Sequence, residues 1–349
     1  MTALAGRVAA GTAGHSAAGA GALAGRGAAD NAGSAANSGA AGGGTAGSTS
    51  QSAGGSAAGS GGSLASGASG TGGTSVGSAG TSVGSAGTAA SGPCEFPEPP
   101  ANMADWVDES WGDQLGNNIR TREAWLLDHV MLDKGELHVC VRWGASSPVP
   151  DAVRTNLATT TERWFNDWFK GLAGYGCFPY GDGIKVSITG WAVKPGSESL
   201  LGTLDPAVPV YTELDGEGDP KCPDACSSFV HWDHDFADCE GGDKNHSDYW
   251  LWFNDRLPGG GGAAAVGGDW GLRMPVSAFV DAFEQPSFNT VEHEMGHGFG
   301  MQDYYDWRGA RPEGGSIMIV GSSPSESPTE ADIWLLKRTW KETRELRGW

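Results

Sequence analysis

The chain has 349 residues and a formal net charge of −20, with 42 acidic and 22 basic side chains. An excess of negative charge this large argues against nucleic acid and against an anionic membrane surface as partners. The sequence also holds no apolar run long enough for a transmembrane helix.

Composition divides the chain at about residue 92. Residues 1–92 are almost wholly Gly, Ala, Ser and Thr, with no aromatic residue, and one seven-residue unit at 74–80 recurs at 81–87. Such a segment cannot bury enough apolar surface to fold, so we expect a disordered low-complexity linker. No signal peptide is evident in residues 1–20. Residues 93–349 are long enough for one folded domain.

All six cysteines fall in the second segment, which predicts up to three disulfides and an oxidising compartment. We therefore expect an extracellular or cell-surface protein, whereas six free thiols would indicate a cytosolic hydrolase. Fifteen pairings are open to six cysteines. The cysteines are Cys94, Cys140, Cys177, Cys222, Cys226 and Cys239.

The first regular elements are predicted between residues 137 and 193. Residues 137–143 alternate in polarity as in a strand, and residues 184–193 form a second apolar strand. Between them, residues 151–170 place aromatic side chains at helical spacing, which favours a core-facing stripe over a ligand platform. Strand, helix and strand together predict a right-handed crossover in a mostly parallel sheet.

A long Pro-, Asp- and Gly-rich segment at 194–245 offers two further metal hypotheses. The acidic residues of 215–219 are candidates for calcium, although a solvated acidic loop is favoured because the EF-hand spacing is missing. A second zinc site is weighed against a disulfide-stapled loop, which we favour. The residues considered for this second zinc are Cys222, Cys226, His231, His234 and Cys239.

Two more strands are predicted before the main motif. Residues 249–254 are aromatic and strand-like, and residues 269–276 alternate up to Pro275, which marks an edge strand. An edge strand binds an extended peptide by adding it to the sheet, and an ordinary proline-blunted edge is the alternative. The residues assigned to this substrate edge strand are Trp270, Leu272 and Met274.

The main motif is H-E-x-x-H-x-x-G-x-x-D, from His293 to Asp303. On a helix, His293 and His297 lie on one face and can bind the same ion, while Glu294 stands beside it as a general base. Gly300 lets the chain turn back, so that Asp303 can become the third ligand. Two nitrogens and one carboxylate oxygen leave one position open, as in a catalytic zinc site.

Several residues after the motif complete the predicted site. Met318 lies in an apolar segment that could form a floor under the metal, and residues 329–345 are expected to form a closing helix. Tyr304 and Tyr305 are candidates for oxyanion support, although packing roles are favoured. Asp306 is the alternative third ligand.

At these residues the sequence resembles the metzincin zinc peptidases, in the snapalysin-like branch with Asp as third ligand. Met318 resembles the residue of their Met-turn. Residues 95–349 are also similar to secreted microbial proteins that are sometimes labelled cellulose-binding, through segments 267–271, 303–307 and 329–334. The resemblance implies an α/β (α+β) fold with a twisted mixed sheet, an active-site helix and a Met-turn.

The function implied is a secreted or surface-tethered zinc endopeptidase with a protein or peptide substrate. The alternative is a non-catalytic carbohydrate-binding surface protein with a structural zinc, which the 15 tryptophans would suit. Retention of Glu294 favours the peptidase, since a structural site has no need of a general base.

Overall fold

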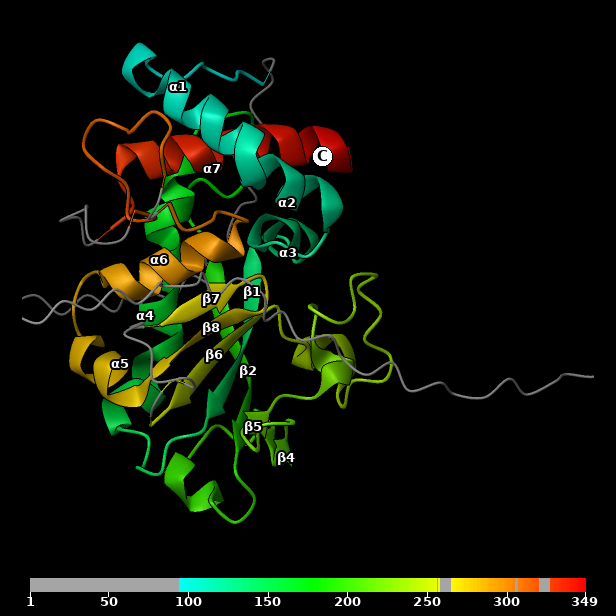
Figure 1. Cartoon of the computed structure of the whole chain (residues 1–349). Helices are drawn as coiled ribbons and strands as arrows, with labels where there is room; N and C mark the ends of the chain where they lie inside the picture. Colours follow the sequence, from blue (N-terminus) through cyan, green and yellow to red (C-terminus); the bar gives the residue numbers. More distant parts are fainter. Residues whose placement is uncertain (1–93, 256, 258–264, 305–306, 320–326) are drawn as a thin grey trace, which may run out of the picture. The chain divides into compact units, whose positions relative to one another are not determined.

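The computed structural model describes residues 94–255, 257, 265–304, 307–319 and 327–349 (Figure 1). The linker predicted for residues 1–92 lies outside these ranges. The helices are α1 (Ala101–Ser110), α2 (Gly116–Thr121), α3 (Leu126–Leu132), α4 (Asp151–Phe169), α5 (Val276–Ala282), α6 (Asn289–Gly298) and α7 (Glu330–Arg347). The strands are β1 (Glu136–Trp143), β2 (Lys185–Val193), β3 (Val210–Tyr211), β4 (Glu213–Leu214), β5 (Pro220–Lys221), β6 (Tyr249–Asn254), β7 (Val266–Gly268) and β8 (Gly271–Pro275).

The centre of the fold is a six-stranded, mostly parallel sheet with the strand order β3-β2-β1-β6-β8-β7. Strands β3, β2, β1, β6 and β8 run parallel, and only β7 pairs antiparallel with its neighbour. The expected mixed α/β fold is confirmed at this level, as is the β1-α4-β2 parallel crossover. A separate hairpin joins β4 to β5.

The two faces of the sheet follow the period of two that strands impose. On β6, Tyr249, Leu251 and Phe253 enter the main hydrophobic core, whereas Trp250 lies in a smaller cluster with Cys140 of β1. Helix α4 packs on β2, and α6 packs on β7 and β8 (Figure 1). The main core therefore lies between the sheet and the helices that position the candidate site.

Helix α4 confirms the prediction made from its aromatic spacing. It begins at Asp151, directly after Pro150 at the cap position. Trp164, Phe165 and Trp168 are buried in the main core. The stripe is therefore a packing surface, as expected.

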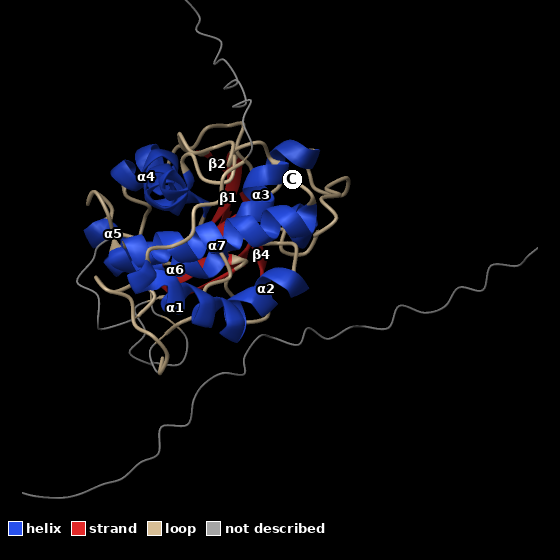
Figure 2. Cartoon of the chain, turned by 90° about the horizontal axis from the view of Figure 1, so that it is seen from above, coloured by secondary structure: helices blue, strands red, loops and turns tan. Residues whose placement is uncertain are grey.

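Helix α7 confirms the closing helix predicted for residues 329–345, and it runs slightly further, to Arg347. Thr329 caps its first turn and Asp332 completes a capping box. The helix packs against α1, and Figure 2 shows both above the strands. Among the described helices, none has the length and hydropathy needed to cross a bilayer.

The structure corrects the prediction that residues 269–276 form an edge strand. Strand β8, which contains Leu272 and Met274, pairs with β6 on one side and β7 on the other, and both side chains are fully buried. Trp270 lies in the turn before it. Pro275 stands at the end of β8, just before α5, where it interrupts no ladder inside the sheet. The edge beside α6 is the shorter β7.

Candidate metal centre

Helix α6 carries three of the four predicted site residues, His293, Glu294 and His297. The helix begins at Asn289, directly after Phe288, whose N–H donates to the Glu292 side chain. After the helix, Gly300 adopts a φ of +85°. This left-handed conformation reverses the chain and returns Asp303 to the helix.

The nitrogens and the carboxylate converge on one point. Asp303 Oδ1 lies 3.0 Å from His293 Nε2 and 3.4 Å from His297 Nε2. Ligands bound tetrahedrally to zinc at about 2.0–2.1 Å are separated from one another by roughly 3.3 Å. The three side chains therefore have the spacing and the donor atoms that suit a zinc ion, and these residues would hold it.

Both imidazoles are fixed by backbone carbonyls. His293 Nδ1 donates to the Ile317 carbonyl at 2.7 Å, and His297 Nδ1 donates to the Met301 carbonyl at 2.8 Å. With Nδ1 bonded to a carbonyl, each ring turns its Nε2 toward Asp303. Hydrogen bonds of this kind set the tautomer and the orientation of metal-binding histidines.

The pKa values of Asp303 and Glu294 are shifted in opposite directions. Burial raises the pKa of Asp303, but hydrogen bonds from His293 and His297 outweigh it and leave the pKa well below its usual range. Burial also raises the pKa of Glu294, and here the two histidines only partly offset it. Asp303 is thus held as a carboxylate at the point where a cation would bind.

Glu294 lies at the convergence point too, with a carboxylate oxygen within 4.8 Å of a ring nitrogen of His293 and of His297. Its Oε2 is 3.8 Å from His297 Nε2, and the residue is 5% exposed. A Cβ on Gly267 of β7 would lie 2.8 Å from Glu294 Oε2. The edge strand therefore passes directly against the proposed general base, and only glycine fits there.

Met318 lies directly beneath α6, as the predicted floor requires. It is fully buried, and a Cβ on Gly296 would come within 2.4 Å of its sulfur. Its carbonyl accepts the N–H of Tyr304 at 2.9 Å. The turn that supplies Met318 also supplies the Ile317 carbonyl to His293, so it supports the centre from two sides.

Asp332 of α7 holds this turn in place, a role that the sequence did not reveal. Its carboxylate accepts the Ile317 N–H at 3.0 Å and the hydroxyl of Ser316. The only sequence signal was its place in the capping motif of α7. A capping carboxylate that reaches a second segment cannot be recognised from spacing alone.

For Tyr304, the structure favours a packing role over oxyanion support. Tyr304 is 1% exposed, and its ring packs edge-on against Trp106 and Trp307 at centroid distances of 4.8 and 5.2 Å. A ring enclosed in this way belongs to the core. Tyr305 and the alternative ligand Asp306 lie outside the described residues.

All six cysteines form disulfides: Cys94–Cys177, Cys140–Cys222 and Cys226–Cys239. The hypothesis of a second zinc bound by cysteine thiolates of segment 222–239 is therefore wrong, because these sulfurs are bonded to one another. The disulfide-stapled loop that the sequence favoured is present.

The acidic loop considered for calcium is paired with arginines. Asp215 bonds Arg142, and Asp219 and Glu217 contact Arg273 at 2.7 and 3.1 Å. The two guanidiniums also lie over the Trp252 ring. All three carboxylates form ion pairs with these two guanidiniums, which fits the ion-paired acidic loop better than a calcium site.

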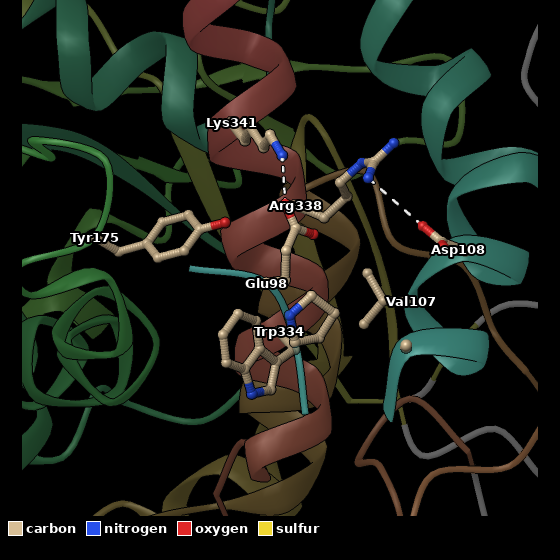
Figure 3. A pocket seen from close by; sticks show the side chains of 9 residues that line it. Glu98, Val107, Asp108, Tyr175, Trp334, Arg338 and Lys341 are labelled. Atoms are coloured by element: carbon tan, nitrogen blue, oxygen red, sulfur yellow. Dashed lines mark hydrogen bonds and ion pairs between the residues drawn. The ribbon is translucent and has the colours of Figure 1, made fainter. Parts of the chain in front are cut away.

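A small surface pocket of about 90 Å³ lies between α1, α7 and the segment before α1 (Figure 3). Ion pairs close it, from Lys341 to Glu98 at 3.3 Å and from Arg338 to Asp108 at 3.5 Å. Its volume is below the roughly 300 Å³ of small-molecule sites, and it shares no residue with the His–Asp centre. We assign it no ligand.

Comparison of the chain with models of known families, with characterised proteins and with solved structures finds no match. The candidate function therefore depends on the residues and the geometry described above.

Proposed function

We propose that this chain is a zinc-dependent endopeptidase of the metzincin type, with Asp303 as the third ligand. The observation that carries the proposal is the convergence of His293 Nε2 and His297 Nε2 on one oxygen of Asp303, with the buried carboxylate of Glu294 beside them. A merely structural site would not need a further carboxylate at this place.

When bound, the zinc ion supplies Lewis acidity to the scissile carbonyl and acidifies water. Glu294 accepts a proton from the attacking water and passes it to the leaving amine nitrogen. Its carboxylate is held against β7 and away from bulk solvent, so the proton moves over a short distance. His293, His297 and Asp303 hold the ion, and the Ile317 and Met301 carbonyls orient the rings.

The position of β7 supports a peptide as the substrate. It is the antiparallel edge of the sheet, and Gly267 touches Glu294. An extended peptide that pairs with this edge would pass across the His–Asp centre. An exposed edge fits main-chain hydrogen bonding, which every peptide offers whatever its side chains.

The arrangement of the sheet and the turn supports the metzincin type. A mostly parallel sheet with one antiparallel edge lies beside the motif helix, and Met318 lies beneath that helix. Three disulfides support the extracellular or cell-surface location, since such bonds persist in oxidising compartments. They count against the alternative of a cytosolic hydrolase.

The packing of the tryptophans disfavours the carbohydrate-binding alternative. Among the described residues, Trp232 is the one tryptophan with a largely exposed side chain, at 45%. Trp106, Trp164 and Trp168 are in the core. Stacking on a polysaccharide needs exposed rings, so the high tryptophan content is explained by packing.

The proposal is tested with Glu294→Gln, which keeps the size of the side chain and removes the base. We expect the same zinc content as the unchanged chain and a loss of casein hydrolysis of about 10²- to 10⁴-fold. Glu284→Gln, at an exposed glutamate, is the matched control and should hydrolyse casein normally. A chelator should abolish hydrolysis by the unchanged chain.

Two results would overturn the proposal. One is hydrolysis by Glu294→Gln at the rate of the control. The other is an unchanged chain that holds zinc at this site, cleaves nothing in an unbiased peptide library, and is retained on insoluble polysaccharide.

A further inference from the structure

A second group of metal-binding side chains lies away from α6. Asp133 follows α3, His138 lies in β1, and His246 and Asp248 directly precede β6. One ligand atom from each of the four lies within 4.8 Å of the others. Because β1 and β6 are parallel neighbours, these residues meet at the same edge of the sheet, at the strands' amino ends.

The distances within this group match those of the His–Asp centre. His246 Nε2 is 3.4 Å from Asp133 Oδ2 and 3.4 Å from Asp248 Oδ1. His138 Nδ1 is 3.3 Å from Asp248 Oδ2 and 4.0 Å from Asp133 Oδ2. Three of the four values are close to the roughly 3.3 Å between ligands on a tetrahedral zinc, with Asp248 facing His246 through Oδ1 and His138 through Oδ2.

The supporting hydrogen bonds are also those of a metal site. His246 Nδ1 is bonded to the Asp243 carbonyl, so its Nε2 faces the two carboxylates, as in His293 and His297. Asp248 is fixed by the hydroxyl of Ser228 at 2.7 Å and by the His138 N–H at 2.8 Å. Both ligands are therefore oriented by a second layer of partners.

A further buried histidine lies beside the same group. His129 of α3 is 1% exposed, and neither of its ring nitrogens forms a hydrogen bond within the described structure. Its Nδ1 lies 3.6 Å from Asp248 Oδ1, close enough for an ion pair but beyond hydrogen-bonding distance. Asp248 thus has imidazole rings on several sides.

We propose that Asp133, His138, His246 and Asp248 form a second, non-catalytic zinc site. Two imidazoles among the donors select a transition ion over calcium or magnesium, which prefer oxygen. Four protein ligands complete a tetrahedron, as in structural sites. This site is independent of the proposed peptidase function, because it shares no residue with the His293 centre.

The site would join three segments of the fold. It ties the end of α3 to β1 and to the segment closed by the Cys226–Cys239 disulfide, which reaches β6 through Ser247 and Asp248. In Figure 1 this yellow-green segment stands beside β1. The ion would therefore fix a long loop that has few hydrophobic contacts of its own.

The competing explanation is an ion-pair network without metal, in which a protonated His246 bridges the two carboxylates. That network places a second imidazole close to a charged one, since the ring centroids of His138 and His246 are 4.2 Å apart. A cation held by neutral imidazoles removes that repulsion.

Metal counting decides between the two. The full chain is loaded with zinc, freed of loosely bound ion by gel filtration, and analysed by mass spectrometry of the elements. We expect about two zinc ions per unchanged chain, about one in His246→Ala, and about one in the double variant His297→Ala/Asp303→Ala. His231→Ala, at a histidine of the same loop, is the control and should keep about two.

Asp133→Asn guards against misfolding of His246→Ala, because Asp133 is partly exposed and its replacement keeps the shape of the side chain. This variant should also bind one zinc ion fewer, and its circular dichroism spectrum should be unchanged. When the chain is loaded with cobalt instead of zinc, the variant should show weaker cobalt absorption. The proposal is overturned if His246→Ala and Asp133→Asn both hold as many zinc ions as the unchanged chain. Because each variant is compared with the unchanged chain, this outcome does not depend on whether the His293 centre binds zinc or hydrolyses peptides.

Discussion

At the scale of single residues, Glu294 has the most consequential environment. Burial raises its pKa above the usual value, despite the two neighbouring histidines. A general base works only when it is deprotonated, so activity is low below the raised pKa and increases as the pH rises through it. We expect kcat/KM to reach its maximum at neutral to mildly alkaline pH. A pH profile of peptide hydrolysis that peaks near pH 5 would contradict this assignment.

Gly267 allows a second test at this scale. A methyl group there would lie 2.6 Å from the Glu294 carbonyl and 2.8 Å from its Oε2, so Gly267→Ala should displace the base. We expect peptidase activity to fall at least tenfold while the zinc content stays the same. Gly112→Ala is the control, since nothing lies within 4 Å of its added Cβ. Equal activity of the two variants would refute the contact.

The four residues of the motif were predictable because helical spacing and one glycine turn determine how they can meet. The groups that orient them were not. The Ile317 and Met301 acceptors are backbone carbonyls, which every residue has, and no residue type marks them. Tyr304 directly follows the proposed ligand Asp303, and its burial against α1 depends on a helix almost 200 positions earlier.

At the scale of elements, α7 and α6 are linked through one carboxylate. Asp332 holds the Ile317 N–H, and the Ile317 carbonyl orients His293. Asp332→Ala should therefore lower the free energy of unfolding by about 1–3 kcal/mol and weaken zinc binding about 10- to 100-fold. Denaturant titration and competition with a chromophoric chelator measure the two effects.

Glu330→Ala is the matched control for this link, since Glu330 lies in the same turn of α7 but is exposed. Its removal should change stability by less than about 0.5 kcal/mol and leave zinc affinity unaltered. If Asp332→Ala lowers stability but not zinc affinity, the carboxylate serves only as a helix cap.

The longer elements were predictable and the edge strand was not. Strands β1, β2 and β6 and helices α4 and α7 carry clear apolar periods over six residues or more. Strand β7 spans three residues, two of them glycine, and so has no period to detect. Strand β8 was taken for the edge because Pro275 lies at its end, where a proline disturbs no neighbour.

At the scale of the whole molecule, a disulfide that closes a longer loop is expected to stabilise the fold more, although the gain rises only with the logarithm of the loop length. Cys94–Cys177 spans 83 residues and Cys226–Cys239 spans 13. Chain entropy predicts contributions of roughly 4.5 and 3 kcal/mol. We expect Cys94→Ala/Cys177→Ala to lose more stability in denaturant titration than Cys226→Ala/Cys239→Ala. A larger loss of stability in Cys226→Ala/Cys239→Ala would show that this short loop also stabilises the segments around it.

The fold class followed from the succession of strand, helix and strand, because parallel neighbours need a crossover. The strand order and the disulfide pairing did not follow, since both depend on which distant segments meet. Cys140 and Cys222, for example, come together only because the β4–β5 segment covers the sheet face opposite the main core.

The link from Asp332 to His293 also bears on when the protein becomes active during its synthesis. The motif helix ends at residue 298, but the carboxylate that steadies its first histidine lies more than 30 residues further along the chain. On the proposed function, a growing polypeptide that has just left the ribosome with its motif helix still lacks this support. Hydrolytic activity would therefore begin only once α7 has emerged and folded, which protects the nascent chain and its neighbours from premature cleavage.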